Sequence, residues 1–117
     1  MTIEKVLEQL GRLKPNTVYD EDVARWLLEL DGQLFHELRM PAQLDRPLRW
    51  PEDQSKTLVA AAPYDGLYLL YAQAKIEFSQ REYGEYNNTM DLYNTAVREY
   101  RKAYRREHMP EPETFQL

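Results

Sequence analysis

Apolar residues recur at helical spacing along most of this 117-residue chain, and this periodicity constrains its fold more than any other feature. The longest apolar stripe advances mainly in steps of three and four residues and comprises Val23, Trp26, Leu27, Leu30, Leu34, Phe35 and Leu38. Such spacing places side chains on one face of a helix, which must be buried against another element. The pattern predicts helices at about 2–13, 19–39, 64–81 and 85–107, and therefore an all-α fold, a small four-helix bundle forming the single domain 1–117.

Helix boundaries follow from local chemistry. Pro15 ends the first predicted helix, and Thr17 or Asp20 can cap the second. Pro63 sits at a plausible start for the third helix, and the short connection "REYGEYN" predicts that the fourth folds back antiparallel to it. Gly32 interrupts the second helix, so we expect another helix to cross closely there.

The segment 41–63 contains Pro41, Pro47, Pro51 and Pro63 and loses the helical period. An irregular stretch of this length is either a functional arm or conceals a short β-hairpin, in which "LRW" would pair with "TLVA". Trp50 is expected to cover the core. The last residues, 108–117, contain two further prolines and predict an extended tail that carries Phe115 and Leu117.

Composition argues against a chemical site. Cys is absent, and His36 and His108 lack metal-ligand spacing, so neither a disulfide framework nor a metal centre is expected. No glycine-rich phosphate loop or nucleophile elbow is present, and we predict no enzyme and no cofactor. The chain has no apolar run of membrane-spanning length and no secretory signal pattern, so we expect no membrane partner and a location inside a cell.

Tyrosine is abundant, with nine residues, and two interpretations compete. Exposed aromatic rings could stack on single-stranded nucleic acid. The helical spacing of these residues with Leu and Val favours a place in the core or at its boundary, and this prediction covers Tyr64, Tyr68, Tyr71, Tyr93, Tyr100 and Tyr104.

Charge is distributed unevenly in a chain whose formal net charge is −5. One cluster is acidic and offers a possible inter-subunit surface: Asp20, Glu21, Asp22, Glu29 and Asp31. The last helix carries the opposite sign and the predicted partner-binding residues, Arg98, Arg101, Lys102, Arg105 and Arg106. Like charges three and four residues apart cost about 0.2–0.5 kcal/mol each, and the helix dipole offsets this only in the last turn. The basic cluster is therefore a solvated face, a protein-binding surface or a nucleic-acid-binding surface.

Two stretches resemble the small helical connector or adaptor proteins encoded among the head genes of tailed bacteriophages and prophages. They span residues 13–38 and 63–110, and the most specific motifs are "WLLELDG", "PYDGLY" and "EYNNTM…YNTA…HMP". The resemblance implies a non-enzymatic subunit of the virion neck, made in the host cytoplasm, that docks beneath the portal as a ring, commonly of twelve copies. DNA would pass through the ring only as channel cargo. The partners would be the portal, engaged by residues 101–117, and tail-side connector proteins.

A second hypothesis is a small nucleic-acid-binding regulator that uses the basic cluster. About five phosphate contacts would give a log–log salt slope of roughly −3 to −5. Conventional major-groove reading by the second helix is disfavoured, because its N-terminal residues Asp20, Glu21 and Asp22 would be repelled by phosphates.

Overall fold

The computed structural model describes residues 1–108, and this range contains four α-helices and no strand. The helices are α1 (Ile3–Leu13), α2 (Asp20–Glu37), α3 (Leu67–Ser79) and α4 (Tyr83–His108), with a short 3-10 helix at Ala42–Leu44. The all-α prediction is confirmed. The predicted tail lies outside the described residues beyond His108. None of the described helices combines the length and the apolar character needed to cross a membrane.

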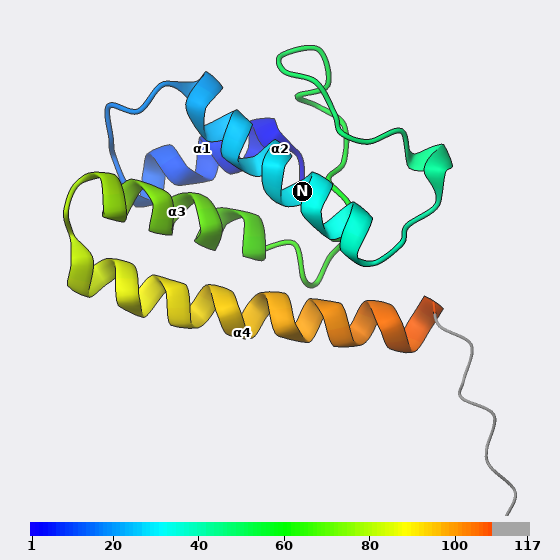
Figure 1. Cartoon of the computed structure of the whole chain (residues 1–117). Helices are drawn as coiled ribbons and strands as arrows, with labels where there is room; N and C mark the ends of the chain where they lie inside the picture. Colours follow the sequence, from blue (N-terminus) through cyan, green and yellow to red (C-terminus); the bar gives the residue numbers. More distant parts are fainter. Residues whose placement is uncertain (109–117) are drawn as a thin grey trace, which may run out of the picture.

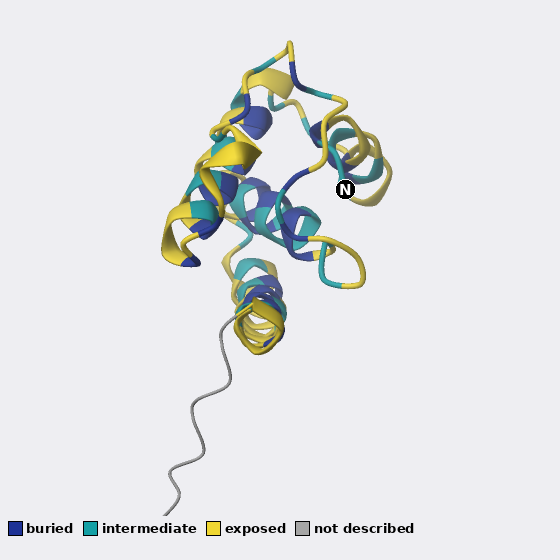
Figure 2. Ribbon diagram, turned by 90° about the vertical axis from the view of Figure 1, so that its right-hand side faces the viewer, coloured by how far each residue is buried: buried dark blue, intermediate teal, exposed yellow. Residues whose placement is uncertain are grey.

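Helix α3 is the centre of the molecule. Helices α1 and α2 pack against one side of it and against each other, whereas α4 packs along the other side (Figure 1) and meets α2 through the side chains of Arg101 and Glu37. The buried residues of α3 are distributed around it and include Leu67, Tyr68, Ala72, Ala74 and Ile76. A helix that is apolar on several sides has to be covered on several sides. Figure 2 views α4 end-on and shows that exposed residues occupy its outer side.

The tyrosines support the core interpretation. Tyr68, Tyr93 and Tyr100 are buried. Tyr64, Tyr71 and Tyr104 are partly buried and pack against the core, as predicted. Burial raises the pKa of the Tyr93 hydroxyl to about 12. These rings are therefore not available as a stacking platform for bases.

The first two helices begin within one residue of their predicted starts, but the predicted caps of the second are not formed. Thr2 caps α1, and its Oγ1 accepts a hydrogen bond from the backbone N–H of Lys5 at 3.1 Å. Helix α2 begins after Tyr19 without a side-chain cap, so the predicted caps Thr17 and Asp20 are wrong. Asp20, Glu21 and Asp22 occupy the first turn of α2, where their negative charges interact favourably with the positive end of the helix dipole.

Three further local predictions are corrected. Helix α3 begins at Leu67 instead of residue 64, because the preceding residues form turns in which the Tyr64 N–H donates to the Ala61 carbonyl at 2.9 Å. A Cβ atom added at Gly32 would meet nothing within 4 Å, so no other helix crosses closely there. Helix α4 begins at Tyr83, two residues before its predicted start.

The proline-rich segment 41–63 forms no β-hairpin. Thr57 instead forms an isolated antiparallel bridge with Thr2, and the Leu58 N–H donates to the Met1 carbonyl at 2.9 Å. Leu48 and Leu58 are buried in the core, and Trp50 packs against it as expected. The segment is therefore a folded part of the domain that pairs with the N-terminal segment.

A buried polar network fastens this segment to α2 and α3. Oδ1 of Asp31 accepts hydrogen bonds from the Val59 N–H and from the Tyr68 hydroxyl, both at 2.8 Å. The Tyr68 hydroxyl in turn accepts from the Ala60 N–H at 2.8 Å. Nε of Arg46 lies 3.2 Å from Oδ2 of Asp31. Burial raises the pKa of Asp31, although these donors and the arginine oppose the shift.

Lys14 likewise joins separate elements of the fold. It follows α1, and its Nζ lies 2.9 Å from a carboxylate oxygen of Glu82 and 2.6 Å from one of Glu85. It also lies 3.6 Å from an oxygen of Glu77, a buried residue of α3. Hydrogen bonds to the two nearer carboxylates raise the pKa of Lys14. This cluster ties the end of α1 to the connection between α3 and α4.

Candidate functional site

The predicted basic residues lie together on the C-terminal half of α4. Arg98, Lys102, Arg105 and Arg106 are exposed, and we refer to these four as the basic surface. In the same half of the helix, the buried face consists of Val97, Tyr100 and Ala103. The helix is therefore amphipathic here, with its apolar stripe toward the molecule and its cations toward solvent.

Arg101 behaves differently from its neighbours. Its Nε donates a hydrogen bond to Oε2 of Glu37, at the end of α2 in the same molecule. The two side chains are 35% and 42% exposed, so the pair contributes only about 0–1 kcal/mol to stability. Within residues 1–108, the four cations of the basic surface form no ion pair.

The helix dipole accounts for part of this charge. Arg105 and Arg106 lie in the last turn of α4, where cations are favoured. His108 follows them and stacks on Tyr104 with ring centroids 4.0 Å apart. Arg98 and Lys102 lie further from the helix end, beyond the reach of this effect. The stability of the isolated helix therefore does not explain why cations occupy these two positions.

A fifth cation joins the basic surface through tertiary packing. Arg39 lies two residues after the end of α2 and has a left-handed backbone (φ 51°), and it lines a surface hollow of about 350 Å³ together with Glu37, Leu38, Tyr104 and Arg105. Two guanidinium groups beside one hollow can bind a carboxylate of a partner. The sequence analysis missed Arg39, because it stands apart from the basic cluster in the sequence.

The predicted acidic surface is smaller than expected. Asp20, Glu21 and Glu29 are exposed, and Asp22 is partly exposed and pairs with Arg25 at 3.3 Å. The prediction was wrong for Asp31, which is 0% exposed and belongs to the buried network. The helical spacing indicates that Asp31 is buried, since residue 31 lies four positions after Leu27 and three before Leu34 and so shares their buried face.

The two charged regions lie at opposite ends of the molecule. In Figure 1 the acidic start of α2 lies at the upper left, and the C-terminal half of α4 ends at the lower right. Within residues 1–108, no ion pair joins Asp20, Glu21 or Glu29 to the basic surface. The acidic residues of one molecule can therefore contact the basic surface of another.

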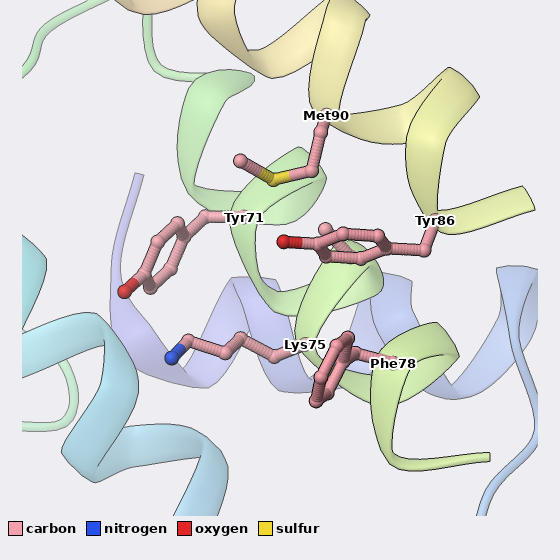
Figure 3. Close-up of a pocket in the computed structure, with 6 residues that line it drawn as sticks. Tyr71, Lys75, Phe78, Tyr86 and Met90 are labelled. Carbon is pink, nitrogen blue, oxygen red and sulfur yellow. The ribbon is translucent and has the colours of Figure 1, made fainter. Parts of the chain in front are cut away.

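A second feature of α4 is a groove near its N-terminal end, which we call the α3–α4 groove. It has a volume of about 320 Å³ and is lined by Tyr71, Ala74, Lys75, Phe78, Tyr86 and Met90 (Figure 3). Its aromatic walls are accessible, since Phe78 is 55% exposed. Leu92 of α4 is another large apolar side chain in contact with solvent, at 61% exposed.

Comparison of the chain with protein-family models, with curated proteins and with solved structures finds no match. In the part of the chain that the structure describes, no group of three or more His, Asp or Glu side chains could hold a metal ion. The predicted contact residues Phe115 and Leu117 lie outside the described residues. The surfaces of α4 are thus the candidate site.

Proposed function

We propose that this chain is a structural subunit of a tailed-phage or prophage virion, a head-tail connector that assembles as a ring beneath the portal and extends the DNA channel. In this proposal the four helices form one small bundle, and its α3–α4 hairpin and extended tail, 108–117, carry the contacts with partners. The subunit acts by binding other proteins and performs no chemistry. It works at the virion neck after assembly in the host cytoplasm.

One observation carries the proposal: the four cations of the basic surface have no carboxylate partner within residues 1–108. Like-charged neighbours on one helix destabilise it by about 0.2–0.5 kcal/mol per pair. A chain that needed only to fold would gain by interspersing carboxylates here. An acidic protein surface supplied by another molecule explains why the cluster is retained.

The charge distribution also suits a ring. In a ring, each subunit places one surface against a different surface of the next subunit. The exposed acidic residues at the start of α2 and the basic surface at the end of α4 provide two such surfaces with opposite charge, which favours correct orientation and fast association. The resemblance of residues 13–38 and 63–110 to connector proteins supports the same function.

A nucleic-acid-binding regulator is the second candidate, and the four exposed cations on one helix favour it. The net charge of −5 opposes it, since nucleic-acid-binding domains are generally basic. Binding to duplex DNA with a log–log salt slope of about −3 to −5 would support this candidate. Absence of a gel shift at low salt would exclude it.

The test of the connector proposal mixes the purified chain with the portal protein encoded beside its gene. Electron microscopy should show a ring of this chain attached to the portal. A gene neighbourhood without portal and major capsid genes, or no complex at micromolar concentrations, contradicts the proposal.

Charge-reversed variants locate the contact. Lys102→Glu with Arg106→Glu should abolish the complex and leave the helical circular-dichroism signal unchanged, because neither residue has an ion pair within residues 1–108. Lys5→Glu with Arg49→Glu makes the same change of net charge at exposed positions on α1 and in the proline-rich segment. This control should assemble normally. Assembly of both double variants would remove the basic surface from the interface.

A further inference from the structure

The α3–α4 groove has the chemistry of a peptide-binding site. Phe78 packs edge-to-face against Tyr86 with ring centroids 5.2 Å apart, and Met90 adds an adaptable thioether beside them. Lys75 is the one charged residue of the lining; its Nζ lies 5.4 Å from the centre of the Tyr71 ring and forms no ion pair within residues 1–108. Figure 3 shows the lysine beside the aromatic side chains.

Such a lining matches an apolar side chain that is flanked by a carboxylate. The volume of about 320 Å³ lies near the lower end of the range of about 300–1,000 Å³ typical of ligand pockets. It therefore suits one aromatic side chain with its neighbours and not a large ligand. The chain itself contains a segment of this kind in residues 109–117, "MPEPETFQL", which carries Phe115, two glutamates and no basic residue.

We propose that the α3–α4 groove of one subunit binds residues 111–117 of a neighbouring subunit, with Phe115 between the aromatic walls and Glu113 beside Lys75. The inference rests on the proposed function, because it requires neighbouring copies of the chain. It assigns a binding site to the end of α4 opposite the basic surface. The tail then acts as a clasp between subunits.

The length of the C-terminal segment favours binding to the groove of a neighbouring copy over the groove of the same molecule. Met90 precedes His108 by 18 residues on α4, which corresponds to about 27 Å at 1.5 Å per residue. Phe115 follows His108 by seven residues, and seven extended residues span at most about 25 Å. Phe115 therefore reaches the groove of its own molecule only if the intervening residues are almost fully extended along α4, whereas a flexible chain of seven residues spans about 15 Å on average. A neighbouring copy can present its groove at a shorter distance.

Another groove, of about 340 Å³, lies near the C-terminal end of α4 and is lined in part by Met40, Tyr64, Tyr104 and Glu107. It is within reach of the tail of the same molecule. The carboxylate of Glu107 would repel the glutamates of the tail, whereas Lys75 would attract them. Charge therefore favours the α3–α4 groove.

The experiment places the photo-crosslinking residue p-benzoylphenylalanine at position 115 of the full-length chain. Equal amounts of isotopically light and heavy protein are mixed, assembled on the portal, irradiated and digested with trypsin. We expect light–heavy cross-links from position 115 to residues of the groove, namely Tyr71 or Ala74 in peptide 57–75, Phe78 in peptide 76–81, or Tyr86 or Met90 in peptide 82–98. Cross-links confined to single molecules, cross-links to other peptides, or none at all would overturn the proposal.

Charge variants give a second measurement. Lys75→Glu should lower the yield of intermolecular cross-links at least fivefold, and adding Glu113→Lys should restore it to within twofold. Lys5→Glu, an exposed lysine on α1, is the matched control and should leave the yield unchanged. An unchanged yield in Lys75→Glu would overturn the pairing. If rings form on the portal without the expected cross-links, the tail inference fails and the connector proposal stands; if no ring forms, both fail.

Discussion

The two sides of α3 differ in how completely they are covered. On one side, α1, α2 and the proline-rich segment enclose a core that includes Ile3, Leu27 and Leu58 and is joined by the Asp31 network. On the other side, α4 packs mainly against α3; within residues 1–108 its outer face carries cations without an ion pair, and an open aromatic groove lies between the two helices. The first side is therefore enclosed, whereas the second leaves charged and apolar side chains accessible.

Length explains part of this difference. Helix α4 has 26 residues and α3 has 13, so α4 is about 39 Å long against about 20 Å. It extends beyond α3 at its C-terminal end, where Figure 1 shows it running past the end of α3. The basic surface lies on this extension. On this part of α4 the buried residues are Val97, Tyr100 and Ala103, and most of the other side chains are exposed.

The largest expected difference between the two sides is in the loss of stability when a leucine is replaced by alanine. Leu27 is 0% exposed, and Leu27→Ala should lower the free energy of unfolding by about 2–5 kcal/mol, because it removes buried methyl groups and leaves a cavity. Leu92→Ala on α4 is the matched control, and it should change this free energy by less than about 0.5 kcal/mol. Urea unfolding followed by circular dichroism measures both. Equal losses in the two variants would show that α4 is covered as completely as α2.

A smaller effect is expected for two tyrosine hydroxyls. Tyr68→Phe leaves the buried Ala60 N–H without its acceptor and should cost about 1–3 kcal/mol. The same change at Tyr86, whose side chain lines the open groove, should cost less than about 0.5 kcal/mol. Urea unfolding gives both values, and faster amide hydrogen exchange at Ala60 in Tyr68→Phe would identify the cause. A neutral Tyr68→Phe would mean that water replaces the hydroxyl.

The smallest expected effect is a difference in pH dependence. Burial raises the pKa of Asp31, so the stabilisation from its protonated form is complete below the unfolded value of about 3.9 and is lost as pH rises through the folded value. Hydrogen bonds from Lys14 lower the pKa of Glu85 on α4, so its contribution is present above about 4.3 and is lost as pH falls through the folded value.

Urea unfolding of the wild type, Asp31→Asn and Glu85→Gln across the acidic and neutral range measures this difference. The stability of the wild type relative to Asp31→Asn should fall as pH rises, and its stability relative to Glu85→Gln should fall as pH decreases. Parallel curves for wild type and Asp31→Asn would mean that the carboxyl group of residue 31 has an ordinary pKa in the folded protein.

Particular residues show how far sequence reasoning reached. The spacing of Leu27, Leu30 and Leu34 predicted α2, and the core positions of the tyrosines followed from the same period. The same spacing rule fails at Leu92, which lies four residues before the partly buried Ala96 and is nevertheless exposed. The next residue, Tyr93, is buried against α3. Leu92 lies about 100° away from it around the helix axis, on a side of α4 that no other helix covers.

Two sequence motifs meet in the fold. Asp31 belongs to "WLLELDG" and Tyr68 to "PYDGLY", and the two side chains share a hydrogen bond of 2.8 Å. These motifs therefore include residues that fasten the proline-rich segment to the helices. This hydrogen bond joins residues 37 positions apart, and no local pattern predicts such a contact.

Local periodicity and charge determined the helical class, the four helices and the concentration of cations on the last one, because each of these depends on residues within a few turns of one another. Only the tertiary structure decided which faces are covered. It buried Asp31, brought Arg39 beside Arg105, paired Thr57 with Thr2 and left Phe78 open to solvent. The physical reason is that burial depends on which elements pack together, and packing is set by contacts between residues far apart in the chain.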